Sequence, residues 1–142
     1  MPRSRAPSKL PRYRKRRGEW AEMKFMVEAA ARGLHLLRPY GDSARFDFVV
    51  TRGARFRRVQ VRATSVLSNG SYQCNCASGK ARRPYSSRQI DFLAVYIVPC
   101  DTWYIIPARV LGRRISISFS PHKPNSRCRY EKFREAWDLL AE

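Results

Sequence analysis

At 142 residues and 44% hydrophobic composition, the chain fits one globular domain with a single core. It carries 29 Lys and Arg against 11 Asp and Glu, a net charge of +18, which favours binding to a polyanion. No apolar run approaches the roughly 18 residues of a membrane span, and the basic N-terminus lacks the apolar segment of a secretory signal. We therefore expect a cytoplasmic protein with reduced cysteines and no membrane partner.

The most basic segment is residues 1–17, which contain eight Lys and Arg, three Pro and no acid. Such a segment cannot bury a core, so we expect a disordered basic arm in front of a single domain over residues 18–142. Removing its eight charges from the total still leaves +10 on the domain. The arm is interpreted as a phosphate-binding element, and the alternative is a solubilising leader. Its expected contact residues are Arg12, Arg14, Lys15, Arg16 and Arg17.

The first predicted element is a helix over residues 19–32, because acids open it, good helix formers fill it and Gly33 follows it. At 100° per residue, Glu22 falls on the apolar side of this helix. The apolar residues expected on that side are Met23, Met26, Val27, Ala29 and Ala30. A carboxylate facing inward needs a cation, a hydrogen-bond donor or a metal, unless it lies at an exposed edge.

A hairpin is predicted next, with strands over residues 44–51 and 56–65. The first strand places Asp47 between two phenylalanines. The second alternates apolar and polar residues, so Gln60 and Arg62 share one face about 7 Å apart. Taken alone, Asp47 is better explained as a solvent-facing strand acid paired with Arg45 or Arg62.

Six further elements complete the predicted order. Strands are expected over residues 71–77, 90–99, 102–108 and 114–119, with a short helix or loop over residues 78–89. The strand over residues 90–99 is almost continuously apolar and is expected at the centre of the sheet. An amphipathic helix is predicted over residues 130–142. Its expected buried side comprises Phe133, Trp137, Leu140 and Ala141.

Three short motifs now occur in a defined order: RGEWAE, RFDFVV and RVQVRAT. Together they resemble the motifs of the PD-(D/E)XK nuclease superfamily. The likeness is strongest to a family of small endonucleases that includes a group I intron-encoded homing endonuclease, and more distant to archaeal Holliday junction resolvases. The resemblance implies an α/β (α+β) fold with a restriction-endonuclease-like αβββαβ core, in which helices flank a mixed sheet.

The resemblance also implies the site. Glu22 takes the place of the helix metal ligand, Asp47 that of the central metal ligand, and Gln60 that of the third ligand, an acid or amide. Arg62 stands where the family has its catalytic lysine. These four residues are the expected catalytic set, with Mg²⁺ as cofactor and Mn²⁺ as its substitute. Lys80, Arg82 and Arg83 in the following basic segment are expected to contact nucleic acid together with the arm.

The predicted function is that of a Mg²⁺-dependent DNA endonuclease, a hydrolase of phosphodiester bonds that acts as a homodimer or higher homo-oligomer. Two departures from the motif bear on this prediction. Gln60 brings no charge to a metal, and Arg62 stays protonated and so cannot act as a general base. Lys80, in the following basic segment, is a candidate to take over the role of the family's catalytic lysine. The alternatives are a catalytically impaired DNA-binding protein that keeps the nuclease fold, and a basic RNA-binding protein without a metal site.

Overall fold

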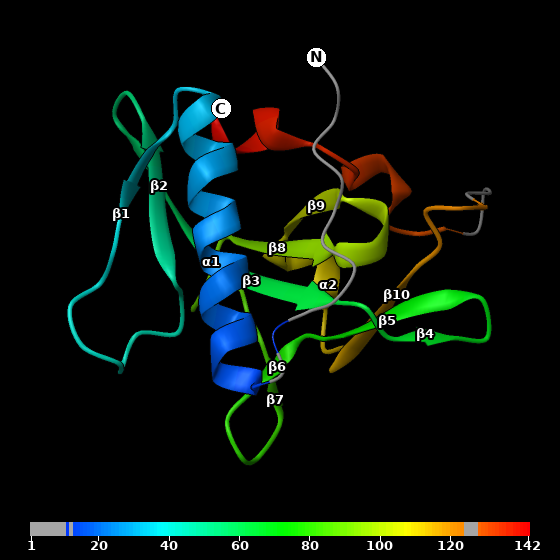
Figure 1. Ribbon diagram of the computed structural model, residues 1–142. Coiled ribbons are helices and arrows are strands. Elements are labelled where there is room, and N and C mark those ends of the chain that lie inside the picture. The colour runs from blue at the N-terminus through cyan, green and yellow to red at the C-terminus, as the bar shows by residue number, and fades with distance from the viewer. Residues whose placement is uncertain (1–10, 12, 124–127) are drawn as a thin grey trace.

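The computed structural model describes residues 11, 13–123 and 128–142, and its centre is a mixed five-stranded sheet with α1 (Arg14–Ala31) along one face (Figure 1). The strand order is β1-β2-β3-β8-β9, in which β3 and β8 are parallel and the other neighbours antiparallel. These strands are β1 (His35–Leu37), β2 (Phe48–Arg52), β3 (Arg55–Thr64), β8 (Phe92–Ile97) and β9 (Thr102–Pro107). The predicted α+β fold with a mixed sheet is confirmed, but the strand predicted over residues 71–77 does not belong to this sheet.

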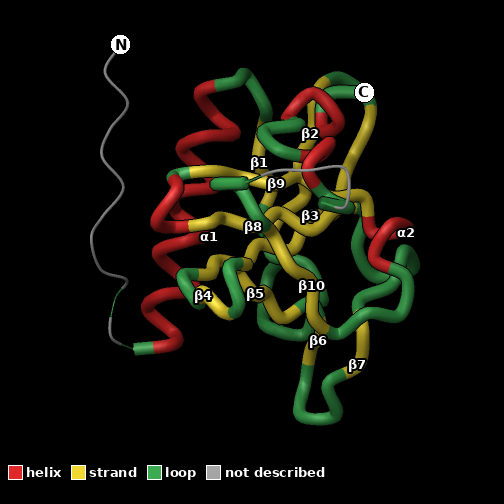
Figure 2. Tube along the Cα trace, turned by 90° about the vertical axis from the view of Figure 1, so that its right-hand side faces the viewer, coloured by secondary structure: helices red, strands yellow, loops and turns green. Residues whose placement is uncertain are grey.

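The strand predicted over residues 71–77 is present over residues 71–75, but residues 78–89, where a short helix or loop was expected, contribute to a β-hairpin. Four short strands fill the crossover between the parallel strands β3 and β8. They are β4 (Leu67–Ser68), β5 (Ser71–Asn75), β6 (Ala77–Ser78) and β7 (Arg83–Pro84). The strand β10 (Ser116–Phe119) pairs with β5, which gives a second sheet of order β10-β5-β4, while β6 and β7 form a separate hairpin. This hairpin projects from the same end of the molecule as the start of α1 (Figures 1 and 2).

The hydrophobic core has a layer on each face of the main sheet. All six residues of β8 are buried, which confirms its predicted central position. Tyr96 packs into the layer beneath α1, whereas Leu93 and Val95 pack into the opposite layer with β5 and β10. Beyond β9, the one-turn helix α2 (Ala108–Leu111) lies on the side of the sheet away from α1 (Figure 2).

The helix α1 differs from its prediction in its start and in its buried face. It begins at Arg14, so residues 14–17 are helical and do not belong to a disordered arm. Arg and Lys are good helix formers, and the single Gly18 costs only about 1 kcal/mol. The buried residues are Ala21, Phe25 and Ala29, while Met23 and Val27 are 53% and 68% exposed. The small residues Ala21 and Ala29 on either side of Phe25 let the helix approach the sheet closely. The distribution of apolar residues along the helix does not predict this buried face.

The C-terminal segment is not the predicted amphipathic helix. It forms two 3-10 turns, η2 (Glu131–Phe133) and η3 (Trp137–Leu140), separated by Glu135 at φ +50°. The carboxylate of Glu135 accepts hydrogen bonds from the Trp103 backbone N–H at 2.9 Å and from the Trp137 indole at 2.8 Å. These bonds to β9 and within the segment hold it in a non-helical path. Phe133, Trp137 and Leu140 are nevertheless buried, as expected.

In the part of the chain that the structure describes, no helix is both long and apolar enough to cross a membrane. The cysteines of the described residues form no disulfide, and Cys74 and Cys76 are buried. Among the described residues, no group of three or more His, Cys, Asp or Glu is placed so that it could hold a metal ion.

Candidate active site

The central acid of the candidate site is Asp47, which lies just before β2. Its backbone N–H donates to the Val59 carbonyl at 2.9 Å, and its carboxylate accepts from the Val61 N–H at 2.8 Å. Asp47 is thereby fixed to the strand that carries Gln60 and Arg62. The alternative of an acid paired with a neighbouring arginine is not observed, since Arg45 donates to Ser78 and Arg62 has other partners.

The second acid, Glu22, reaches the same place from the middle of α1. Its side chain is only 17% exposed and forms an ion pair with Arg38 at 3.0 Å. Burial and the neighbouring Asp47 carboxylate raise the pKa of Glu22 from 4.5 to about 7, although Arg38 opposes this shift. Two carboxylates held together in partial burial repel each other, and a cation between them would relieve that repulsion. The sequence prediction that Glu22 faces inward near Asp47 agrees with this geometry.

Gln60 lies on β3 within one residue of the bond that anchors Asp47. The strand alternates, so the Val59 and Val61 side chains are buried against α1 while Gln60 and Arg62 are partly exposed on the other side. In the described residues, no hydrogen bond joins Gln60 to Glu22 or Asp47. The two acids interact with each other, and Gln60 precedes Val61, whose N–H binds Asp47.

Arg62 is held by the segment around the β6–β7 hairpin. Its guanidinium donates to the Ala77 carbonyl at 3.1 Å and to the Tyr85 hydroxyl at 2.5 Å, and it lies 5.6 Å from the Tyr85 ring centroid. Burial raises the pKa of Tyr85, and the charges of Arg62 and Asp47 act on that hydroxyl in opposite directions. Arg62 and Asp47 thus flank one buried phenol.

A groove of about 500 Å³ opens in front of Arg62. Its walls are the first turns of α1, the C-terminal half of β3, strand β5 and the tip of the β6–β7 hairpin. The arginines that line it are Arg14, Arg17, Arg62 and Arg82. Among the described residues no acid lines it, so the groove is a concentrated positive surface next to the two carboxylates.

The remaining predicted nucleic-acid contacts are distributed around this groove. Lys15 and Arg16 are exposed on the first turn of α1, and Lys80 and Arg83 are exposed on the hairpin. Arg12 lies outside the described residues, as does most of the predicted arm.

Sequence reasoning missed two residues of the site. Arg38 follows β1 and pairs with Glu22, but an isolated arginine in a loop carries no sequence signal of that role. Tyr85 is 2% exposed, and its hydroxyl accepts a hydrogen bond from Arg62. Its place in a basic segment suggested an exposed ring, because the sequence does not show that the hairpin folds back onto β3.

A mixed sheet covered by a helix, with two converging acids beside an arginine-lined groove, matches a restriction-endonuclease-like fold. The model of the PD-(D/E)XK endonuclease family matches residues 13–140 of this chain. The chain therefore belongs to the PD-(D/E)XK endonuclease family, as the sequence motifs indicated.

A similar solved structure supports the fold. The bacterial homing endonuclease I-Ssp6803I superposes with a TM-score of 0.78 at 24% identity, over 89% of this chain and 92% of that chain. Hjc from Archaeoglobus fulgidus, a Holliday junction resolvase, has a TM-score of 0.47 at 18% identity, over 73% of this chain and 84% of its own. No curated protein sequence matches the chain significantly.

Proposed function

We propose that this protein is a Mg²⁺-dependent DNA endonuclease that hydrolyses phosphodiester bonds at Glu22 and Asp47. The observation that carries the proposal is the contact between these two acids in a chain of net charge +18. Hard Mg²⁺ prefers one or two carboxylates with water and substrate phosphate as further ligands. The donor set fits this requirement, and Mn²⁺ is the expected substitute.

Each residue has a separate task in this proposal. Glu22 and Asp47 would hold the cation, and Gln60 would offer its amide oxygen as a third, neutral ligand. A bound Mg²⁺ stabilises negative charge on the phosphoryl oxygens and lowers the pKa of an attacking water. Arg62 would hold the scissile phosphate and stabilise its developing charge without transferring a proton.

The arginine-lined groove supports DNA as the substrate. Arg14, Arg17 and Arg82 line it together with Arg62, so a phosphate backbone that reaches the metal site can be neutralised along its path. Lys80 and Arg83, with the basic residues at the N-terminus, would add further phosphate contacts. Two copies of the chain related by a two-fold axis would place one site on each DNA strand, so we expect a homodimer or a higher homo-oligomer. A cytoplasmic location remains part of the proposal.

The alternative function is a catalytically impaired DNA-binding protein that keeps the nuclease fold. The observation that favours it is Arg62, which takes the family's lysine position and is tied to Ala77 and Tyr85. A binder of this kind would use the same groove without hydrolysis.

One experiment separates the two functions. Supercoiled plasmid and branched DNA are incubated with the wild type and with Asp47→Asn, in Mg²⁺, Mn²⁺ or EDTA, and binding is measured in parallel. The endonuclease predicts nicking that EDTA and Asp47→Asn abolish, while Asp138→Asn, an exposed acid on η3, behaves as the wild type. Binding without cleavage of any of these DNAs in either metal would favour the impaired binder. Preferential binding of RNA would contradict both.

A further inference from the structure

The second sheet presents a polar, uncharged surface that the proposed chemistry does not use. The pairing of β5 with β10 places Asn75 opposite Ser116 and Gln73 opposite Ser118, and the next pair, Ser71 and Ser120, is joined by a hydrogen bond of 2.9 Å. We call these six residues the serine–amide face: Ser71, Gln73, Asn75, Ser116, Ser118 and Ser120.

The serine–amide face is held in place by core packing on the opposite side of the two strands and by a hydrogen bond on the face itself. On the other side of the ribbon, Tyr72, Cys74, Ile117 and Phe119 are buried in the core layer. On the face itself, the Ser118 hydroxyl donates to the side-chain oxygen of Gln73 at 2.9 Å. The hydroxyls and amides are therefore presented by a rigid backbone, and Gln73 is held by its neighbour.

The composition of the face is unusual for this chain. Lys and Arg make up 29 of the 142 residues, and β3 alone carries Arg55, which is exposed, and Arg57 and Arg58, which are partly exposed. An edge strand such as β10 is commonly protected from pairing by charged side chains, above all lysine. None of the six residues carries a charge, so this surface is suited to a partner that offers both hydrogen-bond donors and acceptors.

The face also adjoins the groove of the candidate active site. Gln73, Asn75 and Ser116 line that groove together with Arg62. Ser116 in addition lines a second hollow of about 380 Å³, which follows β10. The serine–amide face thus joins the two hollows into one continuous surface.

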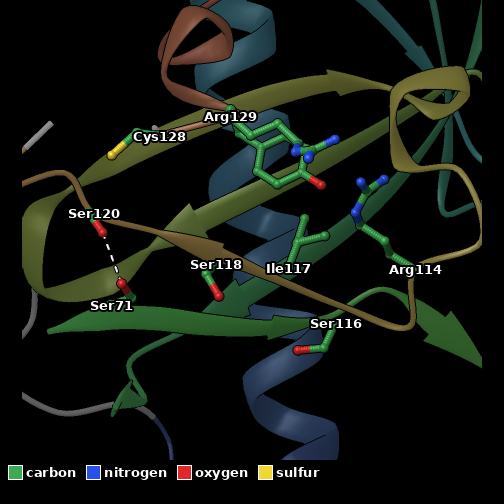
Figure 3. Close-up of a pocket in the computed structure, with 9 residues that line it drawn as sticks. Ser71, Arg114, Ser116, Ile117, Ser118, Ser120, Cys128 and Arg129 are labelled. Atoms are coloured by element: carbon green, nitrogen blue, oxygen red, sulfur yellow. Dashed lines mark hydrogen bonds between the residues drawn. The ribbon is translucent and has the colours of Figure 1, made fainter. Parts of the chain in front are cut away.

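The second hollow carries signs of an anionic ligand. Figure 3 shows the Arg114 and Arg129 side chains reaching toward each other on one side of β10, while the hydroxyls of the strand point to the other side, toward β5. Tyr130 also lines the hollow. It is 4% exposed, and its buried hydroxyl has no hydrogen-bond partner among the described residues. A phosphate oxygen would supply the partner that this hydroxyl lacks.

We propose that the serine–amide face enters the major groove of duplex DNA and reads base edges, while Arg114 and Arg129 hold the adjacent backbone phosphates. This inference rests on the proposed DNA endonuclease function and assigns its sequence specificity. A two-stranded ribbon fits the major groove, which is about 12 Å wide. Amide side chains pair with adenine edges, and hydroxyls accept or donate to any base. Successive rows on the face are about 7 Å apart, roughly two base pairs, so its three rows would span about five base pairs.

The test selects binding sites from a random duplex pool, in Ca²⁺ without Mg²⁺ so that cleavage is not required. Wild type should enrich a consensus. Gln73→Ala and Asn75→Ala should each relax preference by about 5- to 150-fold at one or two base pairs, with an unchanged salt slope. Gln89→Ala is the matched control, because Gln89 lies outside the face and bonds only Ser86 nearby. Arg129→Ala should instead weaken all sequences alike and reduce the salt slope by about 1.

The possible outcomes distinguish this inference from the endonuclease proposal. The inference would be overturned if both amide variants enriched the same consensus as wild type. It would also be overturned if wild type enriched no consensus or preferred single-stranded DNA. Cleavage of plasmid without sequence preference would retain the endonuclease and reject the reading face. If Gln73→Ala alters the consensus of a protein that cuts no DNA, the reading face is retained and the endonuclease function is rejected. Urea unfolding of each variant verifies the fold, and exposed Asn75 provides the test if Gln73→Ala is unstable.

Discussion

Mg²⁺ binding should release a proton from Glu22, because the cation requires the ionised carboxylate. Burial and Asp47 raise the pKa of Glu22 to about 7, so close to half of the metal-free molecules carry this proton at neutral pH. Binding should release about 0.9 protons at pH 6, about 0.5 at pH 7 and about 0.1 at pH 8. Below pH 7 the Mg²⁺ affinity should therefore rise close to tenfold per pH unit, and above pH 8 it should level off.

Titration calorimetry in pairs of buffers with different ionisation enthalpies measures this release directly. The informative variant is Asp47→Asn, whose amide oxygen can still accept from the Val61 N–H but carries no charge. Without that charge the pKa of Glu22 should fall, so less proton is released at pH 6. The loss of one of two charged ligands should also weaken Mg²⁺ binding strongly. Asp138→Asn should reproduce the wild-type titration.

Two results would refute the assignment of the metal site. The first is wild-type Mg²⁺ binding that releases no proton at pH 6, since the metal would then avoid Glu22. The second is unchanged Mg²⁺ affinity in Asp47→Asn, since the metal would then not depend on the central acid. Either result would leave the fold and the family assignment untouched.

Four further predictions follow from the same structure. Arg62→Ala should lower the cleavage rate by a factor on the order of 10² or more, while Arg62→Lys restores the family residue and should keep or raise the rate; equal rates for all three proteins would exclude a catalytic role. Deleting residues 1–12, which hold four basic residues, should weaken DNA binding and flatten its salt dependence; an unchanged slope would identify a solubilising leader. Phe25→Ala should lower the free energy of unfolding by about 3–5 kcal/mol in urea titrations, because its ring stacks on two others in the core. Without metal, that free energy should fall by up to about 3 kcal/mol as pH rises from 4.5 through 7, since Glu22 then loses the proton that the fold favours; a flat profile would contradict its raised pKa.

The central sheet was predictable because local chemistry and tertiary position agree there. Val59 and Val61 alternate with polar residues and are buried on one face of β3, and the apolar run of β8 is buried on both faces. The two acids were found because a helix and a strand of the motif each place one carboxylate, in a fixed order along the chain. Short-range patterns sufficed for these features.

Pairings between distant segments were not predictable. Nothing within residues 71–77 shows that β5 leaves the main sheet and pairs with β10, more than 40 residues later. The C-terminal segment has helical periodicity, yet the bonds of Glu135 to Trp103 and Trp137 impose turns. In both places a tertiary contact outweighs local preference, and that contact is not encoded in any single stretch of sequence.

Arg62 illustrates why the site cannot be understood from its motif alone. Arginine is longer than the family's lysine and permanently charged, so its position depends on what holds the guanidinium. The guanidinium of Arg62 donates hydrogen bonds to the Ala77 carbonyl, in β6, and to the Tyr85 hydroxyl, just after β7. Arg45 donates to Ser78 of the same hairpin. That hairpin also carries Lys80, Arg82 and Arg83. The β6–β7 hairpin and the residue that follows it thus orient the guanidinium of Arg62 beside the two acids. The same hairpin presents basic side chains around the groove. A substitution within the hairpin therefore acts on the geometry of the site as well as on the charge available to DNA.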